Sequence, residues 1–283
     1  MRLIDMRHCC LNSSRIAEIS VPAITQVRQE FGLAGEGASV LLADVADASP
    51  LAAELSAASG TAVATRCDVG DRASVDALAK EAYSRFGKVN LLCANAGVVT
   101  FAPLLATPMA EWERAMRVNF FGVLNTISAF VPRMLQQEDE RHVLITASGA
   151  GLAASNILPT GAYSASKFAA VGFAEALRLE LAPPGIGVTI LCPGSVKTGI
   201  LDTATYAEGA THLRPGETGA PTPGREHVRR MDPADVARIT LDGIRDNELY
   251  VITHPEMQPG LEARLGAQVA ACGRTRAALG RQA

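Results

Sequence analysis

The chain has 283 residues, and its 26 basic and 29 acidic side chains give a net charge of −3. Hydrophobic residues make up 48% and charged residues 19%, which excludes a disordered chain and provides for a large core. The slightly acidic balance argues against nucleic acid or an anionic membrane as partner, and the longest uncharged run, residues 143–166, is too interrupted by polar residues and glycines for a transmembrane helix.

The predicted elements are short apolar runs that alternate with amphipathic stretches. In chain order they are a strand at 40–44, a helix from Asp71 to Gly87, a strand at 89–94, a helix from Thr107 to about residue 135, a strand at 143–146, a helix at 162–181, a strand at 188–192, a helix opened by Asp232 and a strand at 249–252. Asp71 and Thr107 are expected to be N-caps. Because strands that alternate with helices imply parallel crossovers, we predict a doubly wound α/β sheet in a single domain.

Two segments of the chain lie outside these predicted elements. Residues 204–230 are rich in glycine and proline, which indicates a mobile loop over a site, and the basic tail at 274–281 is expected to be a frayed helix end. The six cysteines form no CxxC pair, and neither they nor the five histidines cluster with the spacing of a metal site. We therefore predict no metal and a reducing, cytoplasmic setting.

Tyr163 and Lys167 are four residues apart at the start of a predicted helix, so they share one face. Taken alone, this could be a surface pair. The surroundings favour a catalytic role, because polar or small residues follow the predicted strands at the edge where parallel sheets bind ligands. Those residues are Asn95-Ala96-Gly97, Ser148 and Pro193-Gly194.

Together with Asn119, an asparagine in the middle of a predicted helix, these motifs resemble the short-chain dehydrogenase/reductase family over about residues 34–256. The resemblance implies a Rossmann-like fold and an oxidoreductase that interconverts a secondary alcohol and a ketone by hydride transfer. It also implies a homodimer or homotetramer, with residues 199–230 as the substrate loop.

By the same resemblance, four residues carry the catalysis. Tyr163 would be the general acid/base, and Lys167 would lower its pKa and hold the nicotinamide ribose. Ser148 would bind the substrate oxygen, and Asn119 would open its helix locally and hold a water in a proton relay. Ser148 lies 15 residues before Tyr163, slightly more than is usual in the family, so an insertion is placed within residues 153–160. Ser155 is the alternative, but it lacks the position at the end of a strand.

Two acids indicate the cofactor. Asp44 ends a strand where members of the family that use NAD place an acid on the adenosine ribose, and such an acid repels the 2′-phosphate of NADP. Asp68, with Val69, matches the place of an adenine contact, although both acids could instead be helix caps. The remaining residues implied at the cofactor are Asn95, Ala96 and Gly97 on the adenosine side, and Pro193, Gly194, Val196 and Thr198 at the nicotinamide end.

The N-terminus departs from the family's pattern. A Thr-Gly-x-x-x-Gly-x-Gly turn should fall near residues 19–26, but no glycine occurs there. Residues 1–33 are therefore an atypical segment before a family-type domain at 34–283. A strand at 16–21 and an apolar helix face at Ile24, Val27 and Phe31 are compatible with a degenerate first βα unit, and a mis-started reading frame is the other explanation.

The sequence supports three functional hypotheses. The leading one is an NAD-dependent oxidoreductase acting on a small alcohol or ketone. A catalytically silent relative, kept for binding or oligomerisation, is favoured by the missing glycines. An NADP-dependent ketone reductase is disfavoured by Asp44.

Overall fold

The computed structural model describes residues 17–20, 39–58, 61–153, 160–201, 204–206 and 230–280. Its main sheet has the strand order β3-β2-β1-β4-β6-β7-β9, and every neighbouring pair is parallel. The strands are β1 Ala17–Ser20, β2 Ser39–Asp44, β3 Thr61–Arg66, β4 Leu91–Ala94, β6 Arg141–Thr146, β7 Ile186–Cys192 and β9 Tyr250–Ile252. The order reverses between β1 and β4, which is where doubly wound sheets bind ligands.

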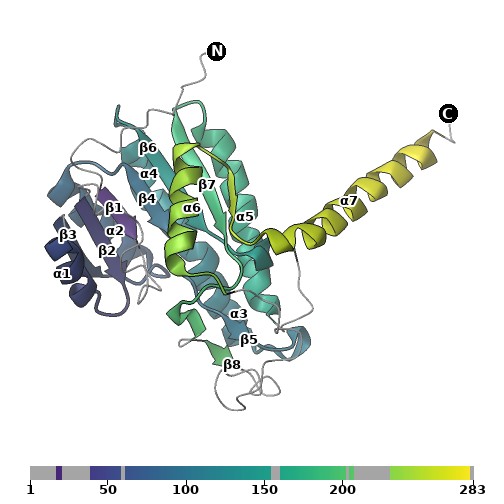
Figure 1. Cartoon of the computed structure of the whole chain (residues 1–283), viewed down its shortest axis with the longest axis horizontal. Coiled ribbons are helices and arrows are strands. Elements are labelled where there is room, and N and C mark those ends of the chain that lie inside the picture. Colours follow the sequence, from purple (N-terminus) through teal and green to yellow (C-terminus); the bar gives the residue numbers. More distant parts are fainter. Residues whose placement is uncertain are drawn as a thin grey trace.

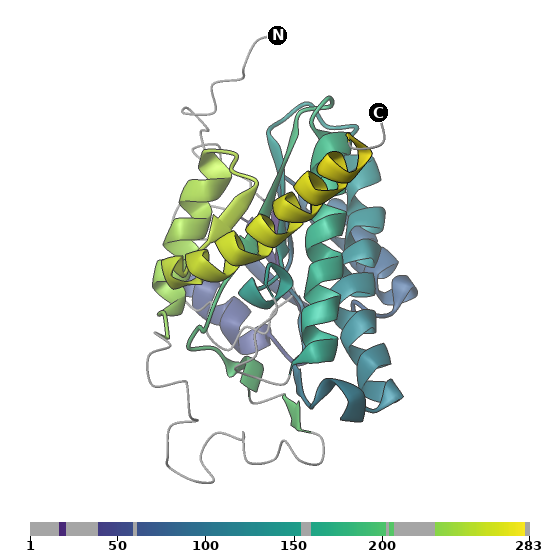
Figure 2. The ribbon, with the colours of Figure 1, turned by 90° about the vertical axis from the view of Figure 1, so that its right-hand side faces the viewer.

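Helices cover both faces of this sheet, and Figures 1 and 2 show the layers. The helices are α1 Ser49–Ala58, α2 Arg72–Phe86, α3 Met109–Met116, α4 Gly122–Met134, α5 Gly161–Leu181, α6 Pro233–Arg245 and α7 Gln258–Leu279. Helices α2, α4 and α5 pack on the larger core, and α6 packs on a second core on the other face. Along β2, Leu41 belongs to the first core while Val40 and Leu42 pack against α1. Burial on both faces explains why these strands are continuous apolar runs.

The sequence predicted most of these elements to within a few residues, with two corrections. The long helix expected after Thr107 is divided into α3, a π-helical turn at Arg117–Phe121, and α4. The prediction that Thr107 is its N-cap was wrong, because the Thr107 hydroxyl donates to the Pro103 carbonyl and α3 begins at Met109. The sequence did not predict α1, β3, or the small sheet of β5 (Thr100–Phe101) and β8 (Thr205–Tyr206).

The N-terminal strand predicted at 16–21 is present as β1, between β2 and β4. Its last residue, Ser20, pairs with Leu42 on one side and Cys93 on the other. The segment before residue 34 therefore contributes a strand to the sheet. The loop without glycine and the predicted apolar helix face lie outside the described residues, apart from the two residues that end β1.

Helix α7 runs away from the body of the molecule (Figure 1), and no residue in it is buried. The tail that was expected to fray is part of this helix as far as Leu279. Among the described residues, no helix is both long enough and apolar enough to cross a membrane.

Candidate active site

The predicted site residues gather at the edge where the parallel strands end. Asp44 is the last residue of β2, Asn95 follows β4, Ser148 follows β6 and Pro193 follows β7. The order of the strands places three spacings between β2 and β6, a span on the order of 14 Å. The edge therefore has two regions, one around Asp44 and one around Ser148.

Tyr163, Lys167 and Ser148 meet at the second region. Tyr163 and Lys167 lie in the first two turns of α5, with the lysine Nζ 5.9 Å from the centroid of the tyrosine ring. The lysine is only 2% exposed, and its Nζ donates to the carbonyl of Thr146, the last residue of β6, at 2.8 Å. The Ser148 hydroxyl is hydrogen-bonded to the Tyr163 phenol. The alternative, Ser155, lies outside the described residues.

Burial dominates the electrostatics of this cluster. It raises the pKa of Tyr163, while the hydrogen bond from Ser148 acts in the opposite direction and the Cys192 thiolate would add to the rise. Burial also lowers the pKa of Lys167 to about 8. The expected lowering of the Tyr163 pKa by Lys167 is thus not met in this structure, because removing the phenolate from water outweighs the favourable interactions.

Asn119 lies in the π-helical turn, fully buried. Its Oδ1 accepts the Val98 N–H at 2.8 Å, and its Nδ2 donates to the Val98 carbonyl at 3.0 Å and to Ser166 Oγ at 2.8 Å. Ser166 in turn donates to the Tyr163 carbonyl at 2.7 Å. Both amide hydrogens of Asn119 are therefore engaged in joining the segment after β4 to α5. A π-helical turn in this position is a frequent mark of a functional site.

The residues assigned to the adenosine side lie around β2, β4 and α4. Asp44 is half-buried, and burial raises its pKa although its Oδ1 accepts the Ala46 N–H at 2.8 Å. Asp68 has one oxygen 2.9 Å from Arg117 Nη1 and the other accepting the Gly70 N–H at 2.8 Å. Neither acid is the N-cap of a described helix.

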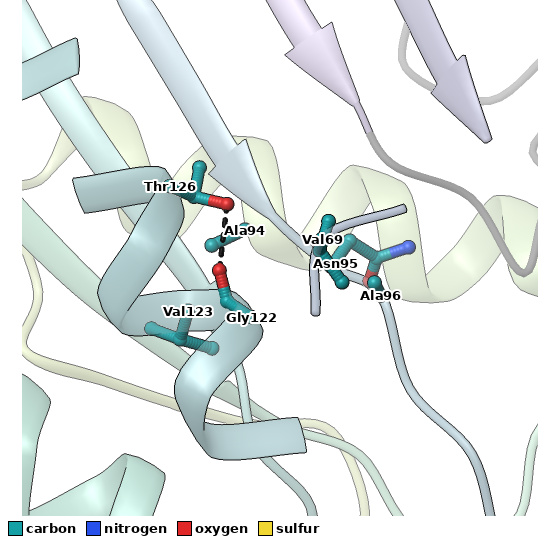
Figure 3. A pocket seen from close by; sticks show the side chains of 7 residues that line it. All are labelled: Val69, Ala94, Asn95, Ala96, Gly122, Val123 and Thr126. Atoms are coloured by element: carbon teal, nitrogen blue, oxygen red, sulfur yellow. Dashed lines mark hydrogen bonds between the residues drawn. The ribbon is translucent and has the colours of Figure 1, made fainter. Parts of the chain in front are cut away.

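Three of these residues line a shallow recess, which Figure 3 shows. The lining residues are Val69, Ala94, Asn95, Ala96, Gly122, Val123 and Thr126. The beginning of α4 can lie this close to Val69 because residue 122 is a glycine. A Cβ on Gly122 would lie 2.6 Å from a methyl group of Val69. The start of α4 thereby packs directly on the segment that follows Asp68.

His254 fixes the segment after β7, a role that the sequence did not indicate. Its Nδ1 accepts the Gly194 N–H at 3.0 Å, so its Nε2 carries the hydrogen that is donated to the Ser195 carbonyl at 3.0 Å. Thr253 Oγ1 lies 2.8 Å from the same Nδ1. Gly194 is required here, since a Cβ on it would lie 2.6 Å from the imidazole ring. A lone histidine near the C-terminus carries no spacing signal, so only the fold reveals these contacts.

Pro193 and Val196, also assigned to the cofactor, tie the same segment to its neighbours. The Pro193 carbonyl accepts the Gly149 N–H at 2.8 Å, which joins the loops after β6 and β7. Val196 forms a parallel bridge with Met231, and its carbonyl accepts the Thr198 N–H at 2.9 Å. The loops on either side of Tyr163 are therefore held together by main-chain hydrogen bonds.

An apolar wall stands beside Tyr163. Val99 and Phe101 are buried, and Tyr163, Ile200 and Tyr206 pack against them. Phe101 and Tyr206 stack with their centroids 5.1 Å apart. Below this wall, Arg114 and Glu111 bind the two threonines of β5 and β8, Thr100 and Thr205, so the beginning of the predicted substrate loop is anchored to α3.

Comparison with known proteins agrees with this geometry. Residues 31–209 match the family model described as short chain dehydrogenase. The chain is 33% identical over 245 residues to the C alpha-dehydrogenase of Sphingobium sp. (strain NBRC 103272 / SYK-6), covering 82% of this chain and 77% of that one. It is 37% identical over 230 residues to the glycine betaine reductase ATRR of Emericella nidulans, covering 80% of this chain but 17% of that much longer protein.

Among solved structures, the fold is similar to a short chain dehydrogenase/reductase from Burkholderia phymatum in complex with NAD. The TM-score is 0.76 at 29% identity, and the match covers 90% of this chain and 96% of the other. The similarity thus extends over nearly the whole of both chains.

We predict that His254→Phe loosens the Gly194 segment. The change keeps a ring but leaves the Gly194 N–H without an acceptor, which costs about 1–3 kcal/mol of unfolding free energy. Amide hydrogen exchange at residues 193–196 should accelerate. His254→Asn, which retains an acceptor near the position of Nδ1, should restore part of the protection.

His142→Phe is the matched control. His142 is also buried and bonded through Nε2 to Thr189, but it lies near the start of β6, at the opposite edge of the sheet. The His142→Phe variant should lower the free energy of unfolding about as much as His254→Phe does, but it should not accelerate amide exchange at Gly194. Unchanged exchange in His254→Phe would contradict the role given to His254.

Proposed function

The chain belongs to the short-chain dehydrogenase/reductase family, and from that premise we propose that it is an NAD-dependent oxidoreductase interconverting a secondary alcohol and a ketone. That it is an oxidoreductase acting on CH–OH groups follows from the family match and the named dehydrogenases among its relatives. The observation that carries the finer proposal is the cluster of Ser148, Tyr163 and Lys167 at the carboxyl edge of the sheet.

Tyr163 is the proposed general acid/base. Its phenol is hydrogen-bonded to Ser148, so an oxygen bound between the two hydroxyls is within reach of both. In reduction, the protonated phenol donates its proton to the developing alkoxide, and Ser148 donates a hydrogen bond that orients the oxygen. In oxidation, Tyr163 must first lose its proton, and the buried Lys167 ammonium favours the phenolate once the two charges face each other. The nicotinamide supplies the acceptor or donor of the hydride.

The space beside Lys167 fits the ribose of that cofactor. Lys167 Nζ donates to Thr146 and has two further hydrogens, since an ammonium group has three. A Cβ on Gly97 would lie 3.4 Å from Nζ and 3.6 Å from Asn119 Oδ1, in van der Waals contact with both, so a side chain larger than that of alanine would extend into this space. We assign Lys167 and Tyr163 to the ribose hydroxyls, Asn95, Ala96 and Gly97 to the adenosine side, and Pro193, Gly194, Val196 and Thr198 to the nicotinamide end.

The side chain of Asn119 is not the group that we assign to the water of the proton relay. Both of its amide hydrogens are engaged by Val98 and Ser166. We therefore assign the water of the relay to its main-chain carbonyl, because a π-helical turn interrupts the regular pairing of carbonyl groups along a helix. The side chain positions α5, and with it Tyr163.

Asp44 supports NAD rather than NADP. Its carboxyl group ends β2, one strand away from β1, where a 2′-phosphate would meet a negative charge. Asp68 would have to exchange its partner Arg117 for the adenine amino group. An NADP-dependent reductase would need a positively charged side chain to bind the 2′-phosphate, whereas Asp44 places a negative charge there.

The substrate is a small molecule with an apolar part. Support comes from the wall of Val99, Phe101, Ile200 and Tyr206 beside Tyr163. We also infer a homodimer or homotetramer in the cytoplasm. The thiols of Cys67, Cys93 and Cys192 are buried and unbridged, as suits a reducing compartment.

Tyr163→Phe should reduce turnover by at least about 10²-fold, because it removes only the hydroxyl that transfers the proton. Turnover is measured on a substrate that the parent enzyme accepts, with circular dichroism to verify folding. Tyr83→Phe is the control, since it removes a buried hydroxyl that donates to the Phe130 carbonyl far from the site. Activity of Tyr163→Phe within tenfold of the parent would remove Tyr163 from the mechanism.

Asp44→Ala should narrow a preference for NAD over NADP, because it relieves the repulsion of a 2′-phosphate. The dissociation constants of both cofactors are measured by calorimetry for the parent and the variant. Asp47→Ala removes the same charge from an exposed position three residues along and should leave the ratio unchanged. A parent protein that prefers NADP would show that the assignment of Asp44 is wrong.

The missing glycines predict weakened NAD binding. Pro22 lacks an N–H donor, and the β-branched Val21 and Ile24 resist the positive φ angles that glycines supply. Replacing residues 19–26 with a Thr-Gly-x-x-x-Gly-x-Gly segment should tighten binding at least tenfold, or about 1.4 kcal/mol. Calorimetry on both proteins measures the difference.

Calorimetry on the parent and the grafted protein distinguishes two explanations of the missing glycines. Micromolar binding by the parent, unimproved by the graft, would mean that another segment holds the phosphates. Absence of binding in both proteins would favour the catalytically silent relative over the enzyme.

A further inference from the structure

Within the described part of the chain, helix α7 contacts the body only near its beginning. Leu261 packs against the main core, and Arg264 donates to the Leu152 carbonyl at 2.9 Å and lies 4.8 Å from the centroid of the Phe168 ring. After its first turns the helix runs away from the sheet, as Figure 1 shows. About four turns are therefore left without packing from the described part of the chain.

The composition of this projecting part is unfavourable for a solitary helix. Isolated helices of this length are marginal in water. Gly266 and Gly273 each cost about 1 kcal/mol relative to alanine in a helix interior. A Cβ at either position would meet nothing within 4 Å, so no contact in the described chain requires a glycine there. A surface that approaches the helix closely would require both.

Two large apolar side chains of the projecting part, Leu265 and Val269, lie on one side of the helix. At 100° per residue, Leu265, Val269 and Cys272 lie on the same side as the two glycines, with Val269 at the centre. Leu265 is 55% exposed and Val269 is 72% exposed. The opposite side carries Ala267, Ala271 and Ala278. The side of the helix centred on Val269 thus carries two large apolar residues beside the gaps left by Gly266 and Gly273.

The charges on this face select the orientation of a partner. Glu262 and Arg276 both lie on it, seven residues before and seven residues after Val269. If a second α7 packed antiparallel about a twofold axis at Val269, Glu262 would face the partner's Arg276. Leu265 would face the partner's Gly273, and Cys272 the partner's Gly266. A parallel pair would instead oppose like charges at both ends.

We propose that α7 is a dimerisation arm that pairs antiparallel with α7 of a second copy of this chain. The pairing is self-complementary in shape and in charge, as a twofold interface requires. The large residues of one helix fill the gaps at the glycines of the other, which permits a close approach of the two backbones. This proposal names one interface of the homodimer or homotetramer inferred above, and it does not depend on the proposed enzymatic activity.

The mass of the full chain in solution, from light scattering during gel filtration, tests the proposal. The subunit is 29.6 kDa, and the parent is expected to have an even number of subunits. Val269→Glu places two carboxylates together at the axis and should halve the mass. Leu105→Glu, at a leucine that is 99% exposed outside α7, is the matched control and should not change it.

Charge reversal tests the orientation. Glu262→Arg and Arg276→Glu should each raise the dissociation constant of the assembly at least tenfold, and the double reversal should bring it within threefold of the parent. A local effect on the helix, such as loss of the Gln258–Glu262 hydrogen bond, would not be rescued in this way. A monomeric parent, an unchanged mass in Val269→Glu, or a double variant no tighter than the single ones would each overturn the proposal.

Discussion

A buried ammonium group organises the candidate active site. Lys167 is 2% exposed, and a charge can be kept in such a place only with polar partners around it. Its Nζ is bound to the Thr146 carbonyl, which fixes α5 to the end of β6. Gly151 lets the segment after β6 pack directly on α5, because a Cβ on it would lie 2.7 Å from the Lys167 backbone. Tyr163, one turn earlier, is positioned as a consequence.

The break in the α3–α4 helix serves the two regions of the site at once. In the π-helical turn, the Asn119 side chain joins the segment after β4 to α5, while Arg117 pairs with Asp68 at the adenosine side. Gly122, directly after the turn, lets α4 approach Val69. A regular helix would turn these residues to different directions, because each inserted residue rotates the rest of the helix by about 100°.

Local patterns predicted much of this from the sequence, and long-range contacts account for the rest. The i, i+4 spacing of Tyr163 and Lys167 and the polar ends of apolar strands need no tertiary information. His254 was missed because it binds groups 59 and 60 residues away that leave no periodic signal. The prediction that Thr107 is an N-cap failed because its hydroxyl donates to the Pro103 carbonyl and does not cap α3. Helix α1 was missed because its small and mixed residues give a weak amphipathic pattern.

The C-terminal segment links these features. His254 holds the loop after β7, and Met257 lies against Gly149 so closely that any side chain there would collide with its sulfur. Arg264, two turns further on, donates to the Leu152 carbonyl in the segment that follows β6. The loops that carry Ser148 and Gly194 are thus braced by a segment that continues directly into the projecting part of α7. Since a helix transmits its orientation along its length, a partner that fixed α7 would also restrict the movement of this brace. In the proposed dimer, the order of the site loops and the pairing of the two subunits would therefore depend on the same stretch of chain.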